Sequence, residues 1–287
     1  MGNKFLILCL LGFLMEIPSA YAQQRKFFSQ GNVSRDSVAD DLGTIPAFTI
    51  YKDNYLITGT NFSGGKITKY NSDAKFQISL RHRLYKSMLP WRIYLFFTYT
   101  QKSFWDIYRK SAPFTETNYN PTLGFGHNFV KDKRIAGVAF LQFEHESNGR
   151  DSIWSRSWNK ISFMGLYAFK RNYTLQAKFW IPVMVAKENK SLPRYAGVGL
   201  LAATYTSNNE RLNCSVVMIK RAEWNLSANW KIEVAYKIFK LDNQYVFLQF
   251  YNGYGESMIA YKYFQRCVRA VSYTHLRAHE TRSNLVC

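Results

Sequence analysis

Most of the chain consists of strand-length segments in which apolar and polar residues alternate one by one. The clearest is Lys75-Phe-Gln-Ile-Ser-Leu-Arg81, where Phe76, Ile78 and Leu80 share one side of an extended chain and the polar residues share the other. The predicted strands are, in order, Tyr51–Thr58, Lys75–Arg81, Ile93–Phe104, Thr122–Phe129, Ala136–Ser147, Ser157–Lys170, Tyr173–Val185, Tyr195–Thr206, Leu212–Arg221, Trp224–Lys237, Tyr245–Tyr254 and one that starts at Ile259. Polar breaks such as Ser207–Glu210 separate these segments, so the pattern predicts an all-β chain of about 12 strands.

Two all-β architectures fit this pattern, a soluble β-sandwich and a closed transmembrane antiparallel β-barrel. Many of the strands run for ~10–14 residues, which is long for a sandwich and suits a tilted crossing of a membrane. Aromatic residues make up 17% of the chain and crowd the strand ends, as interfacial girdles do. The body has no unbroken apolar run of ~20 residues, which excludes a polytopic helical membrane protein. We therefore expect a single transmembrane β-barrel domain over residues 50–269.

The first 22 residues have the pattern of an export signal. Lys4 precedes an apolar stretch from Phe5 to Met15, and Ala20-Tyr21-Ala22 fits a cleavage site. The apolar stretch is too short to span a bilayer, so we expect cleavage before Gln23 rather than a membrane anchor. Residues 23–49 are then expected to form an N-terminal periplasmic segment. Because an exported chain has access to the outer membrane, this end of the sequence favours the barrel over the sandwich.

The C-terminal residues 270–287 differ in character from the body. Val271-Ser-Tyr-Thr-His-Leu-Arg-Ala-His-Glu-Thr281, followed by Asn284-Leu-Val-Cys287, resembles a translated sequencing adapter. We therefore predict that native sequence ends near Arg269. A genuine polar tail is the alternative, and resequencing the 3′ end of the gene would decide between the two.

The net charge is +19, from 38 Lys and Arg against 19 Asp and Glu. In an exported barrel these side chains are expected to face the lumen, the loops and anionic lipid head groups, and no nucleic acid partner is expected. The four cysteines give no disulfide framework, and we predict no disulfide between Cys214 and Cys267.

Three side chains that could perform nucleophilic chemistry fall on one face of a predicted hairpin. His145 and Ser147 are two residues apart on a strand, so both point to the side that also carries the apolar Phe143. Asn159 stands in the same relation to Phe163 on the following strand. In a barrel that apolar side faces lipid, so the hairpin would bring the three together on the outer wall near one rim. Glu residues 144 and 146 have the opposite parity and are expected to face the interior.

Polar side chains on a lipid face are unfavourable by several kcal/mol unless they bond to one another. A hydrogen-bonded cluster of Ser147, His145 and Asn159 would relieve that penalty. The same cluster is a nucleophilic triad, with Ser147 as nucleophile, His145 as general base and Asn159 fixing the imidazole tautomer. A plain polar rim, where the strands leave the membrane, explains the parity equally well, and the spacing alone leaves both interpretations open.

The residues around this cluster resemble a known family. His145-Glu-Ser-Asn-Gly-Arg150 followed by Ser155-Arg-Ser-Trp-Asn159 is similar to the signature of outer-membrane phospholipase A, the calcium-dependent bacterial phosphatidylcholine acylhydrolases. Tyr99–Trp105, Pro113–Tyr119 and Gly253–Ser257 also resemble segments of that family, in the same order. A lone His-x-Ser would mean little, but this ordered set is highly specific.

The resemblance implies a twelve-stranded barrel of the bacterial outer membrane. It implies hydrolysis of the acyl esters of phospholipids and lysophospholipids, with activation by calcium-dependent dimerisation. Ser147 would attack the ester carbonyl, His145 would move the proton and Asn159 would hold the ring. The backbone N–H of Gly149 would donate to the oxyanion, assisted by a calcium-bound water. A catalytically silent outer-membrane barrel, either structural or a narrow pore, is the alternative; a soluble secreted esterase fails because no nucleophile elbow is present.

The calcium ligands implied by the resemblance are Arg150, through its carbonyl, and Ser155 of one subunit, with Ser111 of the other. All-oxygen ligation suits a hard cation. Gln101 matches the polar residue that the family places in its membrane-embedded dimer interface. The family's second, acidic calcium site is doubtful, because Ser152 stands where Asp is expected, with Asp151 beside it.

Overall fold

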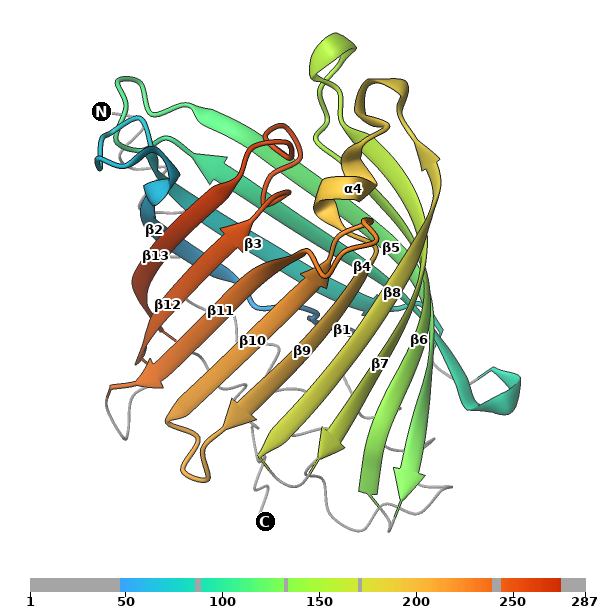
Figure 1. The fold of residues 1–287 in the computed structure, drawn as a ribbon. Coiled ribbons are helices and arrows are strands. Elements are labelled where there is room, and N and C mark those ends of the chain that lie inside the picture. The colour runs from blue at the N-terminus through green and yellow to red at the C-terminus, as the bar shows by residue number, and fades with distance from the viewer. Residues whose placement is uncertain (1–46, 86–88, 132–133, 170–171, 239–243, 275–287) are drawn as a thin grey trace, which may run out of the picture.

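The chain folds into a closed antiparallel β-barrel, as predicted. The computed structural model describes residues 47–85, 89–131, 134–169, 172–238 and 244–274. Thirteen strands in these ranges form one sheet, which closes because β13 pairs with β2 as well as with β12 (Figure 1). The strands are β1 (Phe48–Ile50), β2 (Tyr55–Asn61), β3 (Ser72–Arg83), β4 (Ile93–Trp105), β5 (Phe114–Lys131), β6 (Arg134–Ser147), β7 (Ser157–Phe169), β8 (Tyr173–Val185), β9 (Gly199–Thr206), β10 (Leu212–Lys220), β11 (Ala228–Lys237), β12 (Gln244–Gly253) and β13 (Gln265–Thr274).

In the part of the chain that the structure describes, helices are few and short. They are η1 (Phe62–Gly64), η2 (Pro90–Arg92), η3 (Ser152–Trp154), η4 (Lys187–Asn189) and α4 (Leu192–Ala196). Within the described ranges, no helix has the length and apolar character needed to cross a membrane. The predicted signal peptide, most of the predicted periplasmic segment and residues 275–287 lie outside the described residues. Residues 270–274 belong to β13, and the non-native origin of residues 270–287 stays a prediction.

The extra strand arises because the first strand of the barrel is interrupted. β1 and β2 pair with successive parts of the same strand, β3, so that together they occupy one position in a twelve-position barrel. Residues 51–54 leave the sheet between them, and Asn54 Oδ1 accepts the Ser79 N–H at 2.5 Å in place of a ladder bond. Tyr51 turns into the lumen, where its hydroxyl accepts a hydrogen bond from Gln142 Nε2 of β6 at 3.0 Å. The break thus places an aromatic side chain across the barrel interior.

Two predicted strands begin too early. The predicted strand from Tyr195 starts inside α4, because Pro193 favours a helical first turn and Gly197, at φ +100°, ends it; β9 begins only at Gly199. The predicted strand from Trp224 begins in a loop, where the Trp224 side chain is fully exposed, and β11 begins at Ala228. Local alternation does not reveal that these residues have no strand partner.

The last predicted strand also starts later than expected. Residues 254–264 form a loop, and β13 begins at Gln265 rather than at Ile259. The prolines behave as strand geometry requires. Pro182 lies at a register shift between β7 and β8, because Asn159 pairs with Met184 whereas Lys160 pairs with Pro182.

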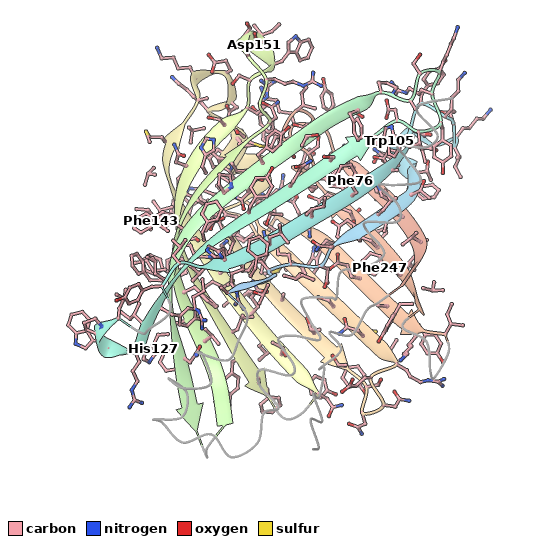
Figure 2. All side chains as sticks on the ribbon, turned by 180° about the vertical axis from the view of Figure 1, so that it is seen from behind. Phe76, Trp105, His127, Phe143, Asp151 and Phe247 are labelled. Carbon is pink, nitrogen blue, oxygen red and sulfur yellow. The ribbon has the colours of Figure 1, made fainter. Side chains whose placement is uncertain are left out.

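The two ends of the barrel differ. The connections 62–71, 106–113, 148–156, 186–198, 221–227 and 254–264 are all at one end, which we call the long-loop rim. α4 and the β6–β7 loop stand at this rim in Figure 1, and Figure 2 shows Asp151 at the same end and His127 near the other.

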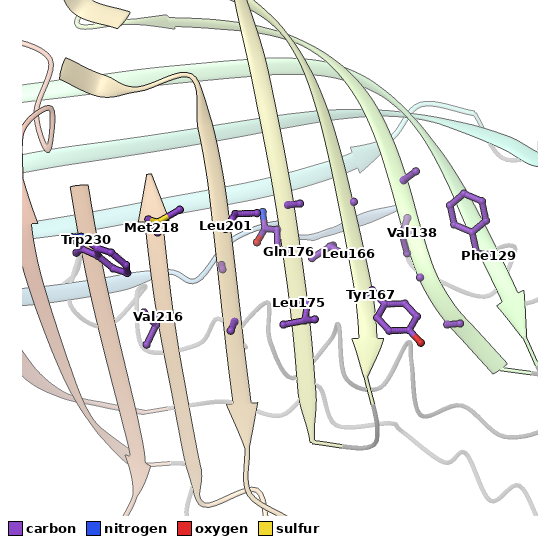
Figure 3. Close-up of a pocket in the computed structure, with 17 residues that line it drawn as sticks. Phe129, Val138, Leu166, Tyr167, Leu175, Gln176, Leu201, Val216, Met218 and Trp230 are labelled. Carbon is purple, nitrogen blue, oxygen red and sulfur yellow. The ribbon is translucent and has the colours of Figure 1, made fainter. Parts of the chain in front are cut away.

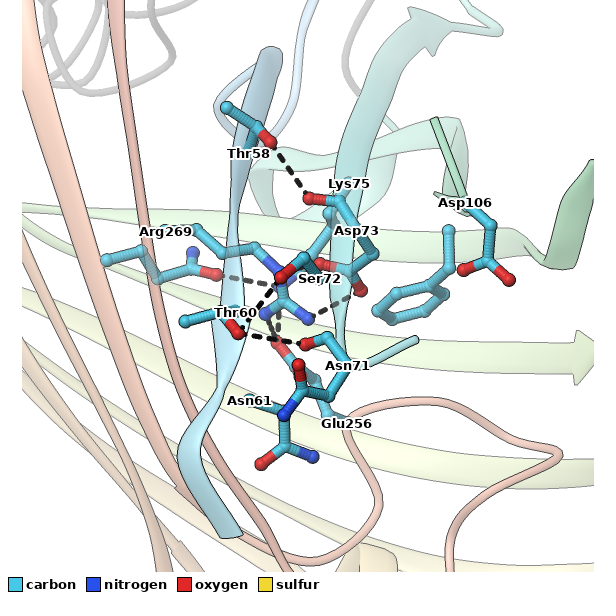
Figure 4. Close-up of polar contacts among 12 residues, drawn as sticks. Thr58, Thr60, Asn61, Asn71, Ser72, Asp73, Lys75, Asp106, Glu256 and Arg269 are labelled. Atoms are coloured by element: carbon cyan, nitrogen blue, oxygen red, sulfur yellow. Dashed lines mark hydrogen bonds and ion pairs between the residues drawn. The ribbon is translucent and has the colours of Figure 1, made fainter. Parts of the chain in front are cut away.

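Ion pairs fill the lumen near the long-loop rim (Figure 4). The Glu256 carboxylate accepts from Lys75 Nζ at 2.9 Å and from Arg269 Nη1 at 2.7 Å, and Arg269 Nε also contacts Asp73 at 2.8 Å. Burial alone would raise the pKa of the Glu256 carboxyl, but Arg269 and Lys75 outweigh burial and hold that pKa well below its usual range. Glu256 belongs to the 254–264 loop, so these pairs draw the loop into the barrel mouth.

Further contacts fix the same loop. The Ile259 N–H donates to Glu116 Oε1 of β5 at 2.7 Å, and Met258 and Tyr261 are buried against Trp158 and the other members of an apolar cluster. These contacts fill the mouth with side chains and disfavour an open pore.

The outer wall is apolar. Exposed large hydrophobic side chains follow the outward parity of the strands; among them are Leu123, Phe143, Phe163, Phe179, Ile181, Leu201, Val216, Ile232 and Leu248. Figure 2 shows Phe143 projecting away from the barrel. Ala139, Gly165 and Ala177 are neighbours across β6, β7 and β8, and a depression of about 880 Å³ lies over them (Figure 3). None of the three predicted catalytic residues lines this depression. An outer surface of this composition is suited to lipid.

Candidate active site

The β6–β7 hairpin brings the predicted catalytic residues to one place. His145 pairs directly with Asn159 in the sheet, and Ser147 pairs with Ser157. His145, Ser147 and Asn159 are all partly exposed on the outer wall, at the end of the hairpin that joins the long-loop rim. The outward parity of Phe143 and Phe163 gives this face the apolar surroundings that the alternation predicts.

One hydrogen bond orients the imidazole ring of His145. His145 Nδ1 and Asn159 Oδ1 are 2.7 Å apart. An amide oxygen can only accept, so Nδ1 donates the hydrogen, and in a neutral imidazole Nε2 then carries the lone pair. This is the tautomer that a general base needs if Nε2 is to take a proton from a serine.

Ser147 is not yet engaged with the base. No hydrogen bond joins its hydroxyl to His145 in the described part of the chain, although the two side chains leave the same face of β6 two residues apart. Nucleophile–base contacts are often long in an enzyme without substrate and shorten in the complex. The arrangement therefore supplies an oriented base and a hydroxyl on the same face of β6, two residues away.

Strand β5 supports this face from the other side. Tyr119 pairs with Ser147 and Thr122 pairs with Glu144, so the same register sets Pro121 opposite His145. Proline has no N–H to offer its neighbour. Asn120 Nδ2 instead donates to the His145 carbonyl at 2.8 Å, which satisfies a group that Pro121 would leave unpaired.

The inner face of the same hairpin is held by ion pairs, as the opposite parity of the two glutamates predicts. Lys160 Nζ lies 2.9 Å from Glu146 Oε2 and 3.8 Å from Glu144 Oε2. Lys178 Nζ of β8 lies 2.6 Å from Glu144 Oε1, and Trp158 Nε1 donates to Glu146 at 2.9 Å. These contacts fix the backbone that carries the outer residues.

The β6–β7 loop, residues 148–156, contains several residues predicted to act on the oxyanion or to bind metal. Gly149 has φ +64°, and a Cβ built there would lie 2.9 Å from the Tyr119 ring, so the position suits glycine on two grounds. Ser152 has φ +51°, and Ser111 of the β4–β5 loop has φ +66°. A left-handed backbone is uncommon for serine and often marks a functional loop.

The oxygens available for a cation are hydroxyls and carbonyls. Within the described ranges there is no group of three or more His, Cys, Asp and Glu side chains that could hold a metal ion. Neither Arg150 O nor Ser155 Oγ accepts a hydrogen bond from any described residue, whereas the carbonyls of Ser152 and Asp151 are used within the loop. Two free oxygens on one loop fit a hard cation such as Ca²⁺. The Arg150 side chain donates to Thr115 O and so points away from that role.

Gln101 lies on the outer face of β4. Its Oε1 accepts from Tyr99 at 3.1 Å, and its Nε2 lies 3.4 Å from Ser103 Oγ. Gln101 pairs with Tyr119, which in turn pairs with Ser147, so the register forms a row across three strands from Gln101 to the candidate nucleophile.

Two asparagines at the site were not identified from the sequence. Asn120 contacts the backbone of His145, and Asn148 contacts three backbone groups of the β6–β7 loop. The Asn148-Gly149 dipeptide is a turn signal that could have indicated the second of these. Cys214 and Cys267 lie on β10 and β13, which are not neighbours, and both are free thiols.

Known proteins with similar sequences are phospholipases. Residues 43–270 match the family model described as phospholipase A1. The phospholipase A1 of Salmonella typhimurium is 32% identical over 238 residues, which cover 76% of this chain and 78% of the relative. That of Klebsiella pneumoniae is 33% identical over 231 residues, covering 75% and 78%.

Solved structures give the same result. The Salmonella typhi outer membrane phospholipase, solved as a dimer with bound calcium, matches with a TM-score of 0.69 and 25% identity. The outer membrane phospholipase A of Escherichia coli matches with a TM-score of 0.68 and 26% identity. Each match covers 84% of this chain and 98% of the other.

Proposed function

The chain belongs to the phospholipase A1 family, enzymes that act on phospholipid acyl esters, and we propose that Ser147, His145 and Asn159 are its catalytic triad. The hydrogen bond of 2.7 Å between His145 Nδ1 and Asn159 Oδ1, on the lipid-facing wall, is the observation that carries this proposal. Its substrates are phospholipids and lysophospholipids of the bacterial outer membrane, which reach the outer wall without leaving the bilayer.

The proposed reaction has two halves. Ser147 Oγ attacks the ester carbonyl carbon while His145 Nε2 takes the hydroxyl proton, and Asn159 Oδ1 holds the Nδ1–H of the resulting imidazolium. The tetrahedral intermediate collapses, the bond to the alkoxy oxygen breaks, and His145 returns the proton to the lysophospholipid that leaves. A water molecule then hydrolyses the acyl-serine by the same route and releases the fatty acid.

The oxyanion of each tetrahedral intermediate needs a donor close to Ser147. We assign this role to the Gly149 N–H, which has no hydrogen-bond partner among the described residues. A bound Ca²⁺ would supply additional positive charge near the oxyanion. Arg150 O and Ser155 Oγ would hold it, with Ser152 as a further candidate.

The activation mechanism is a dimer in which Ser111 of the second copy completes the calcium site. A dimer with bound calcium is described for the Salmonella typhi relative. In this chain, Ser111 stands on a long-loop-rim loop with its backbone at φ +66°, and Gln101 is a partly exposed polar residue on the apolar wall that a second copy would cover. Ser111→Ala is therefore expected to raise the calcium concentration for half-maximal activity and to leave thermal unfolding of the barrel unchanged.

The test is fatty-acid release from mixed phospholipid–detergent micelles, with calcium and with chelator. We expect calcium-dependent release from the wild-type barrel, none from Ser147→Ala, and wild-type release from Ser157→Ala. Ser157 is the matched control because it is the outer-face serine paired with Ser147. No release from a folded wild-type barrel with calcium would favour the catalytically silent structural barrel.

A further inference from the structure

Asn148 follows the candidate nucleophile directly and is only 4% exposed. Its backbone extends the hairpin by one step, since the Asn148 N–H donates to Arg156 O at 3.0 Å. Both polar atoms of its side chain form hydrogen bonds. Oδ1 accepts the backbone N–H of Arg156 at 2.9 Å and that of Arg150 at 3.3 Å, and Nδ2 donates to Trp154 O at 2.9 Å. One amide therefore connects both ends and the middle of the β6–β7 loop.

The contact with Arg150 has a particular consequence for Gly149. A side-chain oxygen of residue i that accepts the N–H of residue i+2 forms an Asx-turn, which fixes the backbone of the residue between them. Here that residue is Gly149, at φ +64°. The turn uses the Arg150 N–H and leaves the Gly149 N–H without a partner among the described residues.

Strand β5 also contacts the backbone around Gly149. The Tyr119 ring would lie 2.9 Å from a Cβ at Gly149, so ring and backbone are in close contact. The Arg150 guanidinium donates to Thr115 O on β5 and ties the loop to the same strand. Asn148 therefore makes hydrogen bonds within the β6–β7 loop, while β5 makes contacts that hold the loop against the barrel.

We propose that Asn148 is the positioning residue that orients the Gly149 N–H toward the oxyanion and, by bonding the Arg150 N–H, restricts the backbone of Arg150, whose carbonyl is the proposed cation ligand. This proposal rests on the proposed function. Asn148 touches neither substrate nor reacting atoms, because its side chain is buried under the loop. It acts by fixing the two backbone groups that follow it in the chain.

The two polar atoms of Asn148 can be tested separately. Asn148→Ala removes all three side-chain hydrogen bonds, whereas Asn148→Asp keeps an oxygen for the N–H groups of Arg150 and Arg156 and loses only the donor to Trp154 O. Because loss of one oxyanion donor lowers kcat by 10²–10³-fold in a well-studied protease, we expect Asn148→Ala to lower kcat by on the order of 10²-fold. Asn148→Asp should recover most of that loss.

A structural role alone would give a different pattern. If Asn148 acts by positioning, the KM of Asn148→Ala for the micellar lipid should stay within about twofold of the wild-type value, since the lipid-facing wall is unchanged. It also predicts that the thermal unfolding temperature stays near wild type and that more calcium is needed to form the dimer, measured by sedimentation in detergent. Asn172→Ala is the matched control, because Asn172 Nδ2 anchors a turn at the opposite rim by donating to Thr206 O at 2.7 Å.

The expected result is a selective fall in kcat for Asn148→Ala, rescue by Asn148→Asp and no change for Asn172→Ala. Wild-type kcat in a folded Asn148→Ala barrel would overturn the inference, provided that Ser147→Ala is inactive in the same assay. Activity that survives in Ser147→Ala would instead remove the proposed function. If Asn148→Ala does not fold, Asn148→Ser replaces it; its shorter side chain leaves at least one of the three groups unpaired, so wild-type kcat would again overturn the inference.

Discussion

The two faces of the β6–β7 hairpin use similar polar residues for opposite purposes. On the inner face, Glu144 and Glu146 are paired with lysines at 2.6–2.9 Å, and Glu144 and Lys160 are buried. On the outer face, His145 and Asn159 share one hydrogen bond, and Ser147 has no hydrogen-bond partner for its hydroxyl among the described residues. The strands, their register and their distance from the rim are the same for both faces.

The difference fits a hairpin that is held rigidly on its inner face and carries the proposed triad on its outer face. A buried charge that is fully paired lies in a deep free-energy minimum and does not exchange partners readily. A hydroxyl and an imidazole nitrogen with unused capacity can accept a substrate. The inner pairs therefore fix the geometry, and the outer residues keep the bonding capacity that the proposed triad requires.

The largest expected effect tests the outer face. Ser147→Ala should lower phospholipid hydrolysis by 10³-fold or more, on the order found for nucleophile removal in serine hydrolases. The free energy of unfolding should stay near the wild-type value, because the removed hydroxyl makes no hydrogen bond to a described residue. Fatty-acid release and urea unfolding measure the two quantities. A large loss of stability would mean that the outer face also holds the barrel together.

The next effect tests the inner face. Lys160→Met leaves Glu146 without its lysine and should lower the free energy of unfolding by about 3 kcal/mol, as expected when one partner of a buried pair is removed. Arg194→Met is the control, since Arg194 pairs with Glu223 at an exposed position and should contribute less than about 1 kcal/mol. Equal unfolding midpoints for the two variants would contradict the assignment of stability to the inner face.

A smaller effect is expected where a residue orients rather than reacts. Asn159→Ala removes the acceptor of the His145 proton and should lower kcat by on the order of 10²-fold while leaving measurable activity. Asn159→Asp should retain more activity than Asn159→Ala, because a carboxylate also accepts from Nδ1. Complete inactivity of the Asn159→Ala barrel would show that orientation matters as much as the nucleophile.

The smallest expected effect is on the pH dependence of the free energy of unfolding. It concerns Glu256, another paired carboxylate of the lumen. The pKa of Glu256 is lowered in the folded barrel, so its stabilising contribution is present at neutral pH and is lost as pH falls below the unfolded value of 4.5. Glu256→Gln should therefore be less stable than wild type by about 2 kcal/mol at pH 7. Thermal unfolding from pH 7 to pH 3 should show the gap narrowing below pH 4.5. A constant gap would mean that the carboxylate charge does not contribute.

Much of the fold could be predicted because alternation is a local property. Side chains of a strand point to opposite faces whatever the partner strand is, so Phe143, His145 and Ser147 could be assigned to one face before any pairing was known. The same parity assigned Glu144 and Glu146 to the interior. The errors occurred where the chain leaves the sheet, near Tyr195, Trp224 and Ile259, because apolar residues there bury against other elements or stand exposed instead of joining a strand.

The candidate site could be predicted in part, for the same reason as the fold. Parity predicted that His145, Ser147 and Asn159 share one face, the family resemblance predicted their roles, and the register between β6 and β7 sets His145 directly opposite Asn159. Asn148 and Asn120 could not be identified in this way. Their side chains bond to backbone groups, and the sequence does not show which backbone groups a fold leaves unpaired.

The sequence by itself determined that this chain forms strands, which side of each strand is apolar, and that a Ser, a His and an Asn share the apolar side. Only the tertiary structure decided how the barrel closes, how the 254–264 loop fills its mouth and which backbone groups the two asparagines hold. The reason is the range of the interactions. The contacts that close the lumen join residues far apart in the chain, such as Arg269 and Asp73, 196 positions apart, and no local pattern specifies such a pair.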